Sequence, residues 1–369
     1  MSEEPFASHE SPAVDEQLFD AALNGDVARL GALLDEYPDK RDARNEPYEW
    51  TLLHVAAHNG HLDAVDLLLT RGLDVNSRET GDNTSAMHWA AAAGHVDIVK
   101  RLADAGGDVV GQGDDHELEV IGWATCWDGC DDAAHRAVVD ELLTRGARHH
   151  IFSAIAMNLA DEVRGIVAAD PAAVGQRMSV NENRQLPLHF AARKNRPDMV
   201  ALLFELGADP AATDGYGAPA AVYAATPEVD RRVLAMLGGK GPADLFIALA
   251  LDDQTTAARL LRENPGIIKV GGASAGTLHL LAKRGNVRAV RWLLDRNADP
   301  SAVWSHWDAD VTPLHLAALH GHAEVVRLLL QVGADPGIRD SKHDGNAMDW
   351  AEHAERAEIV DVLANFART

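Results

Sequence analysis

Two polar stretches in the last third of the sequence carry the residue types best suited to binding chemistry. One runs from Trp304 to Asp310 and contains two tryptophans, one histidine and two aspartates, while the other contains His343 and Asp344. Tryptophan offers a large contact area at a low cost in conformational entropy, so it is frequent where proteins bind partners. We predict the following contact residues: Trp304, His306, Trp307, Asp308, Asp310, His320, His343 and Asp344.

Two other interpretations of these residues stay open. Trp304 and Trp307 could instead fold back and cover the backbone of their own loop. Histidine and aspartate side chains also ligate divalent metals, but we rank a metal site well below the other two interpretations and predict none. The glycine-rich stretch 271–276 lacks the lysine and the preceding strand of a phosphate-binding loop, so no nucleotide cofactor is predicted.

The two cysteines are the other candidates for metal chemistry. Cys126 and Cys130 are four residues apart, a spacing that places two thiolates on one face of a helix. Gly129 interrupts that helix, however, and a zinc ribbon needs a second pair of cysteines. We therefore predict that both cysteines are buried packing residues and that the chain holds no cofactor.

The segment from Thr312 to Asp335 defines the elements that must position the polar stretches. Pro313 suits the first turn of a helix, because the amide that proline lacks would have no partner there. Gly321 then ends this helix, and Gly333 suits the left-handed cap of a second one. The apolar stripe of the second helix consists of Val325, Val326, Leu328, Leu329 and Leu330.

This segment resembles the ankyrin repeat, whose signature includes Thr-Pro-Leu-His-x-Ala. The residues that carry the resemblance are Thr312, Pro313, Leu314, His315 and Ala317, followed by Gly321 and His322. Such helix pairs cannot bury their apolar faces alone and must stack on one another. The resemblance implies an all-α solenoid with hairpin loops along one edge. It also implies that a partner binds at the concave face, which the loops and the first helices line.

The pattern recurs along the chain after the first residues. We predict eleven helix pairs, at roughly residues 16–38, 51–73, 85–107, 119–147, 150–171, 186–208, 218–239, 244–265, 276–298, 312–334 and 346–367. The resemblance implies that the histidines that recur with the repeat are structural: His54, His61, His88, His95, His189, His279, His315 and His322. One periodic position is predicted to be core and holds Trp89, Trp123 and Trp350.

A second spacing suggests that the repeats form three modules. Phe19, Phe152 and Phe246 each lie nineteen residues before a proline, in helix pairs that lack the signature. We predict a disordered acidic leader over residues 1–14. Three ankyrin modules follow, with four, three and four helix pairs, over residues 15–149, 150–242 and 243–369.

Basic pairs stand out at the positions that the resemblance assigns to the groove, directly before the glycine turns. These residues are Arg193, Lys194, Lys283 and Arg284. In an acidic chain they could form a strip that receives an acidic segment of a partner. The alternative is local salt bridging to the many neighbouring carboxylates.

Composition limits the class of partner. The formal net charge is −24, from 57 acidic and 33 basic residues, and such a field repels the phosphates of nucleic acids. The N-terminus lacks the pattern of a signal peptide, and no apolar run is as long as a membrane span. Two cysteines suit a reducing compartment. We expect a cytoplasmic monomer that binds neither nucleic acid nor membrane.

The resemblance implies a non-enzymatic scaffold that recognises a protein or peptide through the groove and the loop tips. The alternative is an enzyme or a small-molecule binder with a pocket lined by histidine, aspartate and tryptophan. These two functions differ in geometry, because catalysis needs groups from distant repeats to converge around one cavity.

Overall fold

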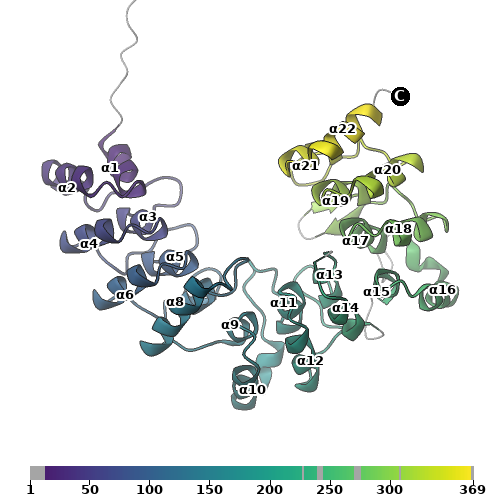
Figure 1. Cartoon of the computed structure of the whole chain (residues 1–369), viewed down its shortest axis with the longest axis horizontal. Coiled ribbons are helices and arrows are strands. Elements are labelled where there is room, and N and C mark those ends of the chain that lie inside the picture. The colour runs from purple at the N-terminus through teal and green to yellow at the C-terminus, as the bar shows by residue number, and fades with distance from the viewer. Residues whose placement is uncertain (1–12, 227, 239–243, 270–275, 307–308, 367–369) are drawn as a thin grey trace, which may run out of the picture. The chain divides into compact units, whose positions relative to one another are not determined.

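The computed structural model describes residues 13–226, 228–238, 244–269, 276–306 and 309–366. Within these ranges the chain forms twenty-two α-helices, three short 3-10 helices and one two-stranded sheet (Figure 1). The helices follow one another as eleven pairs, which confirms the predicted all-α repeat architecture. None of the described helices is both long and apolar enough to cross a bilayer.

The chain divides into two compact units, one up to Met157 and the other from Asn158 onwards. The helices of the first unit are α1 (Val14–Leu23), α2 (Val27–Glu36), α3 (Leu52–His58), α4 (Leu62–Thr70), α5 (Ala86–Ala92), α6 (Val96–Asp104), α7 (Glu119–Trp123), α8 (Ala133–Thr144) and α9 (Ile151–Ala156). Its odd-numbered helices pack on one another in sequence and form the first layer, and α2, α4, α6 and α8 form the second layer.

The second unit repeats this two-layer arrangement. Its helices are α10 (Ala160–Ala169), α11 (Pro187–Arg193), α12 (Pro197–Glu205), α13 (Ala220–Tyr223), α14 (Arg231–Leu237), α15 (Asp244–Ala250), α16 (Gln254–Glu263), α17 (Thr277–Lys283), α18 (Val287–Leu294), α19 (Pro313–Leu319), α20 (Ala323–Gln331), α21 (Ala347–His353) and α22 (Ala357–Phe366). Strands β1 (Trp304–His306) and β2 (Ala309–Val311) lie between α18 and α19. Helices α15, α17, α19 and α21 stack in order as a first layer.

The 3-10 helices Pro38–Lys40, Pro171–Gly175 and Pro265–Ile268 each begin at a proline that follows the second helix of a pair. These are the three prolines that we used to divide the chain into modules. The division into three modules stays a prediction.

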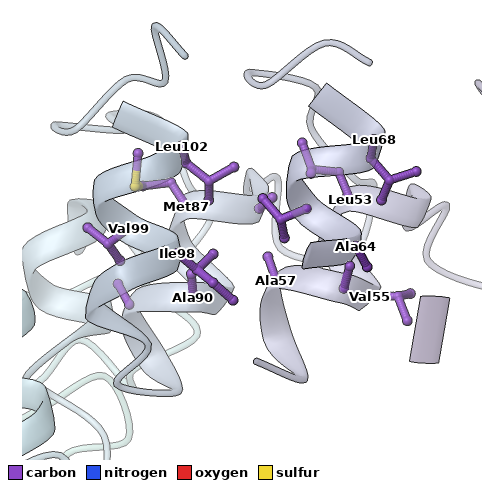
Figure 2. Packing of buried hydrophobic residues seen from close by; sticks show 14 of the residues in the cluster. Leu53, Val55, Ala57, Ala64, Leu68, Met87, Ala90, Ile98, Val99 and Leu102 are labelled. Carbon is purple, nitrogen blue, oxygen red and sulfur yellow. The ribbon is translucent and has the colours of Figure 1, made fainter. Parts of the chain in front are cut away.

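Buried aliphatic side chains hold consecutive repeats together. In the first unit, Leu53 and Leu68 come from one helix pair and Met87, Ile98 and Leu102 from the next, and all five are at most 2% exposed (Figure 2). Burying a side chain of this size contributes about 1.5–3 kcal/mol. Because each helix pair can bury its apolar face only against a neighbouring pair, these faces drive the pairs to stack.

The signature histidines join neighbouring repeats, as the resemblance implies. The backbone N–H of Thr312 donates to Nδ1 of His315 at 3.1 Å, so Nε2 carries the proton and donates to the carbonyl of Gly345 at 3.1 Å. His54 and His88 make the same two contacts. In each, Nδ1 accepts the backbone N–H of the residue three positions earlier, and Nε2 donates to a backbone carbonyl before the next repeat's first helix. Each such histidine therefore caps its own helix and anchors the next loop.

The glycine turns between paired helices have a second reason to be glycine. Gly60 has a φ of +81°, and a Cβ there would lie 2.9 Å from the ring of His95 in the next repeat. Nε2 of His95 donates to the carbonyl of His58 at 3.1 Å. His61 and His322 lie in the same way over Gly25 and Gly285 of the preceding repeats, which confirms the predicted structural role of these three histidines.

Candidate functional site

The loop between α18 and α19 forms a short antiparallel hairpin. Trp304 is opposite Val311, Ser305 is opposite Asp310, and His306 is opposite Ala309. Side chains alternate between the two faces of a strand, and those of His306, Ala309 and Val311 are on the buried face. The predicted contact residues Trp307 and Asp308 lie outside the described residues.

Trp304 lies against the start of α17. Its ring stacks on His306 with centroids 4.8 Å apart and lies 5.5 Å from the ring of His279. A Cβ on Gly276 would be 2.5 Å from the indole, so only glycine fits beneath it. Trp304 remains half-buried. It therefore packs against its own repeat, as the fold-back interpretation expects, and still offers part of its ring to solvent.

Behind the hairpin, Lys283 of the predicted basic strip lies close to two of the predicted contact residues, His306 and His320. Nζ of Lys283 lies 3.4 Å from Nε2 of His306, and both residues are 5% exposed. Burial lowers the pKa of Lys283 to about 8. Burial, and then the charge of Lys283, lower the pKa of His320 to about 4 and hold that of His306 far below its usual range. The structure places Lys283 and His306 inside the protein, whereas His320 is half-buried.

The other members of the predicted basic strip are also engaged. Arg193 and Lys194 are half-buried over the ring of Phe190, at 5.1 and 5.9 Å from its centroid. Arg284 donates to three carbonyls in the segment after α13, those of Ala224 (3.1 Å), Thr226 and Val229 (3.3 Å). Arg284 therefore ties α17 to the segment after α13, and its guanidinium is not presented as an open anion site.

This role of Arg284 can be tested by substitution. Arg284→Met keeps the aliphatic stem and removes the three hydrogen bonds, so we expect it to lower the free energy of unfolding by about 2 kcal/mol. Arg288→Met is the matched control, because Arg288 makes an exposed ion pair with Asp252, which is worth at most about 1 kcal/mol. Urea unfolding followed by circular dichroism measures both. Equal stabilities of the two variants would contradict the assignment.

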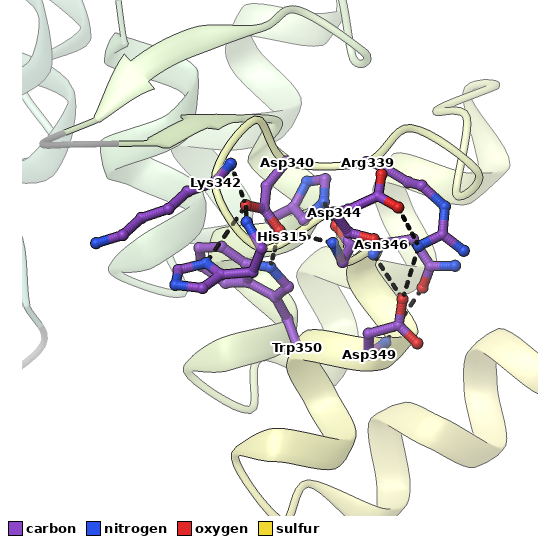
Figure 3. A network of polar contacts seen from close by, with 10 residues as sticks. His315, Arg339, Asp340, Lys342, Asp344, Asn346, Asp349 and Trp350 are labelled. Atoms are coloured by element: carbon purple, nitrogen blue, oxygen red, sulfur yellow. Dashed lines mark hydrogen bonds and ion pairs between the residues drawn. The ribbon is translucent and has the colours of Figure 1, made fainter. Parts of the chain in front are cut away.

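The loop before α21 is organised around the buried carboxylate of Asp340 (Figure 3). It accepts hydrogen bonds from the backbone N–H groups of Lys342 (2.9 Å), His343 (2.7 Å) and Gly345 (2.9 Å), and from Nε1 of Trp350 (2.9 Å). Burial alone would raise the pKa of Asp340, but these donors outweigh it and hold the pKa well below its usual range. The loop is therefore fixed while its outer side chains remain exposed.

A pocket of about 400 Å³ opens between α19 and α21 beside this loop. It is lined by Leu319, His343, Gly345, Asp349, Trp350 and His353. We call it the C-terminal pocket. The backbone N–H of Asp310 donates to the Ser341 hydroxyl at 2.8 Å, so the hairpin and the pocket loop form one continuous surface.

The predicted contact residues thus fall into two groups. Trp304, His320 and Asp310 are half-buried near the hairpin, and His343 and Asp344 are exposed on the pocket loop. The sequence did not single out the pocket residues Asp349, Trp350 and His353. A signal was available for His353, which occupies the same position before the turn as Leu319. Trp350 was assigned to the core by its period, but it is only half-buried.

Metal chemistry finds no support in this part of the chain. Among the described residues, no three histidine, cysteine, aspartate or glutamate side chains are placed to hold a metal ion. Cys126 and Cys130 are both buried, as predicted for packing residues.

Stacked two-helix units with a loop between consecutive pairs define the class of α-solenoid repeat proteins. A profile described as "Ankyrin repeats (3 copies)" matches residues 18–112, 245–340 and 278–368, and one described as "Ankyrin repeats (many copies)" matches residues 176–222. The chain belongs to the ankyrin-repeat family. Ankyrin repeats are generally protein–protein interaction modules.

One solved structure that resembles this chain is the ankyrin repeat domain of human ASB11. The two sequences are 22% identical, and the TM-score is 0.41. The match covers 62% of this chain and 98% of the other.

Proposed function

We propose that this protein is a non-enzymatic scaffold that recognises a protein segment at the C-terminal pocket and the adjoining hairpin. The observation that carries the proposal is the pocket itself, whose rim combines the exposed side chains of His343, Asp349 and His353 with the half-buried ring of Trp350. An aromatic floor with polar groups at the rim suits an apolar anchor residue of a partner and hydrogen bonds around it.

The preformed loop strengthens this proposal. Four hydrogen bonds donated to the Asp340 carboxylate fix the backbone that carries His343, so little conformational entropy is lost when a partner binds. Trp304 and Asp310 extend the surface along the hairpin. His306 and Lys283 are buried and support the hairpin from behind.

The finer predictions about the partner remain proposals. Arg193 and Lys194, which lie half-buried over the ring of Phe190, would meet an acidic segment of the partner with the part of their side chains that remains exposed. We also propose a monomer in the cytoplasm. The net charge of −24 supports the monomer, since like-charged copies repel one another.

A small-molecule site is the second candidate, and the volume of the C-terminal pocket favours it. About 400 Å³ falls within the range of 300–1,000 Å³ that is common for small ligands. Enzymatic chemistry at the pocket would need catalytic groups that converge on one point. The ionisable residues of the pocket lining are His343, His353 and Asp349.

The experiment compares three forms of the full chain as bait in affinity capture from a native lysate. The pocket variant is His343→Ala with His353→Ala, and the matched control is Glu324→Ala with Gln331→Ala on α20, where the side chains are also exposed. We expect the wild type and the control to retain the same protein, and the pocket variant to bind it at least tenfold more weakly, a loss of about 1.4 kcal/mol.

Capture of the same proteins by all three forms would reject the proposal. A small-molecule site gives a different result. Native mass spectrometry would then detect a bound compound in the wild type and the control, but not in the pocket variant, while protein capture stayed unchanged.

A further inference from the structure

The first unit carries a continuous series of aromatic rings that the proposed function does not use. We call it the aromatic row. It consists of Trp50, Trp89, Trp123 and Trp127, with His58 and His116 at its sides. Successive indole centroids are 4.4, 5.1 and 5.3 Å apart. The row runs across three repeats along the first layer, from Trp50, two residues before α3, through α5 and α7, to the loop after α7.

Hydrogen bonds fix one end of the row. Nε1 of Trp123 donates to the buried carboxylate of Asp114 at 3.1 Å. His116 lies 5.0 Å from the ring of Trp127 and pairs with Asp82, with 3.2 Å between Nε2 and the carboxylate. A ligand would therefore meet rings that are already oriented, and this lowers the entropy lost on binding.

Packing accounts for Trp123, which is 3% exposed, but it does not account for Trp89. The residue after the signature histidine is Leu316 in one repeat, Leu280 in another and Phe190 in a third, and these are 2%, 3% and 0% exposed. A leucine is therefore enough to fill that position. Trp89 occupies it in the first unit and is only half-buried, so part of its ring extends beyond what the core requires.

Other members of the row are also accessible. Trp50 and Trp127 are half-buried, and His58 is exposed. Aromatic surface that keeps contact with solvent is typical of binding sites, because tryptophan is enriched among the few residues that supply most of the binding free energy.

The charge around the row specifies the partner. Residues 111–132 contain seven aspartates and glutamates and no lysine or arginine. Asp115, Asp128 and Asp131 of this segment are exposed. Carboxylates beside indole faces favour a cation, and a guanidinium both stacks on an indole and forms paired hydrogen bonds with a carboxylate.

Two arginines of the preceding loops bind backbone carbonyls. Arg44 donates to the carbonyls of Glu49 and Arg78, and Arg78 donates to those of Asn83 and Gln112. Both guanidinium groups are thus engaged with loop backbone.

We propose that the aromatic row is a second interaction surface, which binds an arginine-bearing segment of a partner protein. Its guanidinium groups stack on the half-buried indoles of Trp50, Trp89 and Trp127, near the carboxylates of residues 111–132. This surface lies on the first unit and takes a cationic segment, whereas the C-terminal pocket takes an apolar anchor. The two surfaces would let one chain bind two different segments.

Fluorescence anisotropy of labelled hexa-arginine tests the proposal on the full chain at about 150 mM salt, where long-range attraction is screened. The first variant is Trp89→Leu, which introduces the residue that other repeats carry at this position and leaves the charge unchanged. Its control is Phe190→Leu, at the same position of a repeat in the second unit. We expect at least fivefold weaker binding for Trp89→Leu and no change for the control.

A pair of charge variants separates the row from net charge. Asp128→Asn with Asp131→Asn removes two carboxylates beside the row, and Asp63→Asn with Asp140→Asn removes two from α4 and α8 of the same unit. Only the first pair should weaken binding. Hexa-lysine should bind the wild type more weakly than hexa-arginine, because an ammonium does not stack on the rings.

Two results would overturn the proposal. Equal binding of hexa-arginine by the wild type and Trp89→Leu would exclude a contribution from the row. Equal weakening by both charge pairs would show that the peptide senses only the acidity of the chain. The pocket variant should bind hexa-arginine as the wild type does, which keeps this test independent of the proposed function.

Discussion

Acidification from pH 7.5 to pH 5 is expected to lower the free energy of unfolding by about 2 kcal/mol for each fully buried signature histidine, as a pKa of about 4 in the folded state requires. His54, His88 and His279 are at most 1% exposed. Burial lowers the pKa of each from 6.5 to about 4. Burial favours the neutral ring, and at His54 and His88 the Nδ1 atom also accepts a backbone N–H, a hydrogen bond that protonation of Nδ1 would remove.

The direction of this effect follows from proton uptake. Between pH 6.5 and pH 4 the unfolded chain binds a proton at each of these histidines and the folded chain does not. Their contribution is therefore complete above pH 6.5 and is lost as the pH falls towards 4. Two of the three rings lie in the first unit and one lies in the second, so both units should lose stability.

Urea unfolding at pH 7.5, 6 and 5, followed by circular dichroism, measures this loss. His279→Gln should reduce the pH dependence by the share of one histidine, although it also lowers stability at pH 7.5. The control His353→Gln changes an exposed residue and should leave the pH dependence as in the wild type. A free energy of unfolding that stays constant from pH 7.5 to pH 5 would contradict the expectation.

The repeat architecture could be predicted from the sequence because residues within each repeat mark where its helices begin and end. Thr312 with Pro313 marks the start of one helix, and Gly321 and Gly333 mark the two turns. These signals are local, because each of these residues acts through contacts within its own repeat or with the neighbouring repeat. The signature histidines share this property, and the period alone identified them as structural.

Features that depend on what covers a residue could not be read from the period. Lys283 occupies a groove position, but the spacing of 36 residues from His279 to His315 accommodates a hairpin that folds over it and buries it. Trp89 and Trp350 illustrate the opposite case. Their period indicates core, and Trp123 at the same position is indeed 3% exposed, but part of each of these two rings stays at the surface.

Besides the signature histidines, buried carboxylates in the loops form a second recurrent hydrogen-bonding pattern, which the sequence analysis did not identify. Asp340 accepts the indole N–H of Trp350, Asp114 accepts that of Trp123, and Asp214 accepts the Tyr223 hydroxyl at 2.6 Å. In each case the aromatic residue lies on the first-layer helix that follows the loop. An acidic residue nine or ten positions before a tryptophan or tyrosine is the sequence signal for it.

Removal of the Asp340 carboxylate is therefore expected to have the largest effect of any single substitution near the C-terminal pocket. Asp340→Ala leaves four donors without their acceptor, in a loop where the carboxylate side chain is fully buried. A buried donor left without an acceptor costs about 1–3 kcal/mol, so with four donors we expect a loss of about 3–5 kcal/mol after partial relaxation of the loop. Asp344→Asn removes an exposed carboxylate four residues later and suits the φ of +54° at that position, so it is the matched control and should change stability by less than about 0.5 kcal/mol.

Hydrogen exchange locates this loss, because the cost falls on one loop and the helices that it joins. In Asp340→Ala, the amides of residues 342–353 should exchange faster, while those of α3 to α6 in the first unit keep their protection. The pocket loop would no longer be preorganised, so the same variant should lose the captured partner while retaining hexa-arginine binding at the aromatic row. Unchanged exchange at residues 342–353 would show that Asp340 does not hold the loop, and the fixed pocket rim would then need another cause.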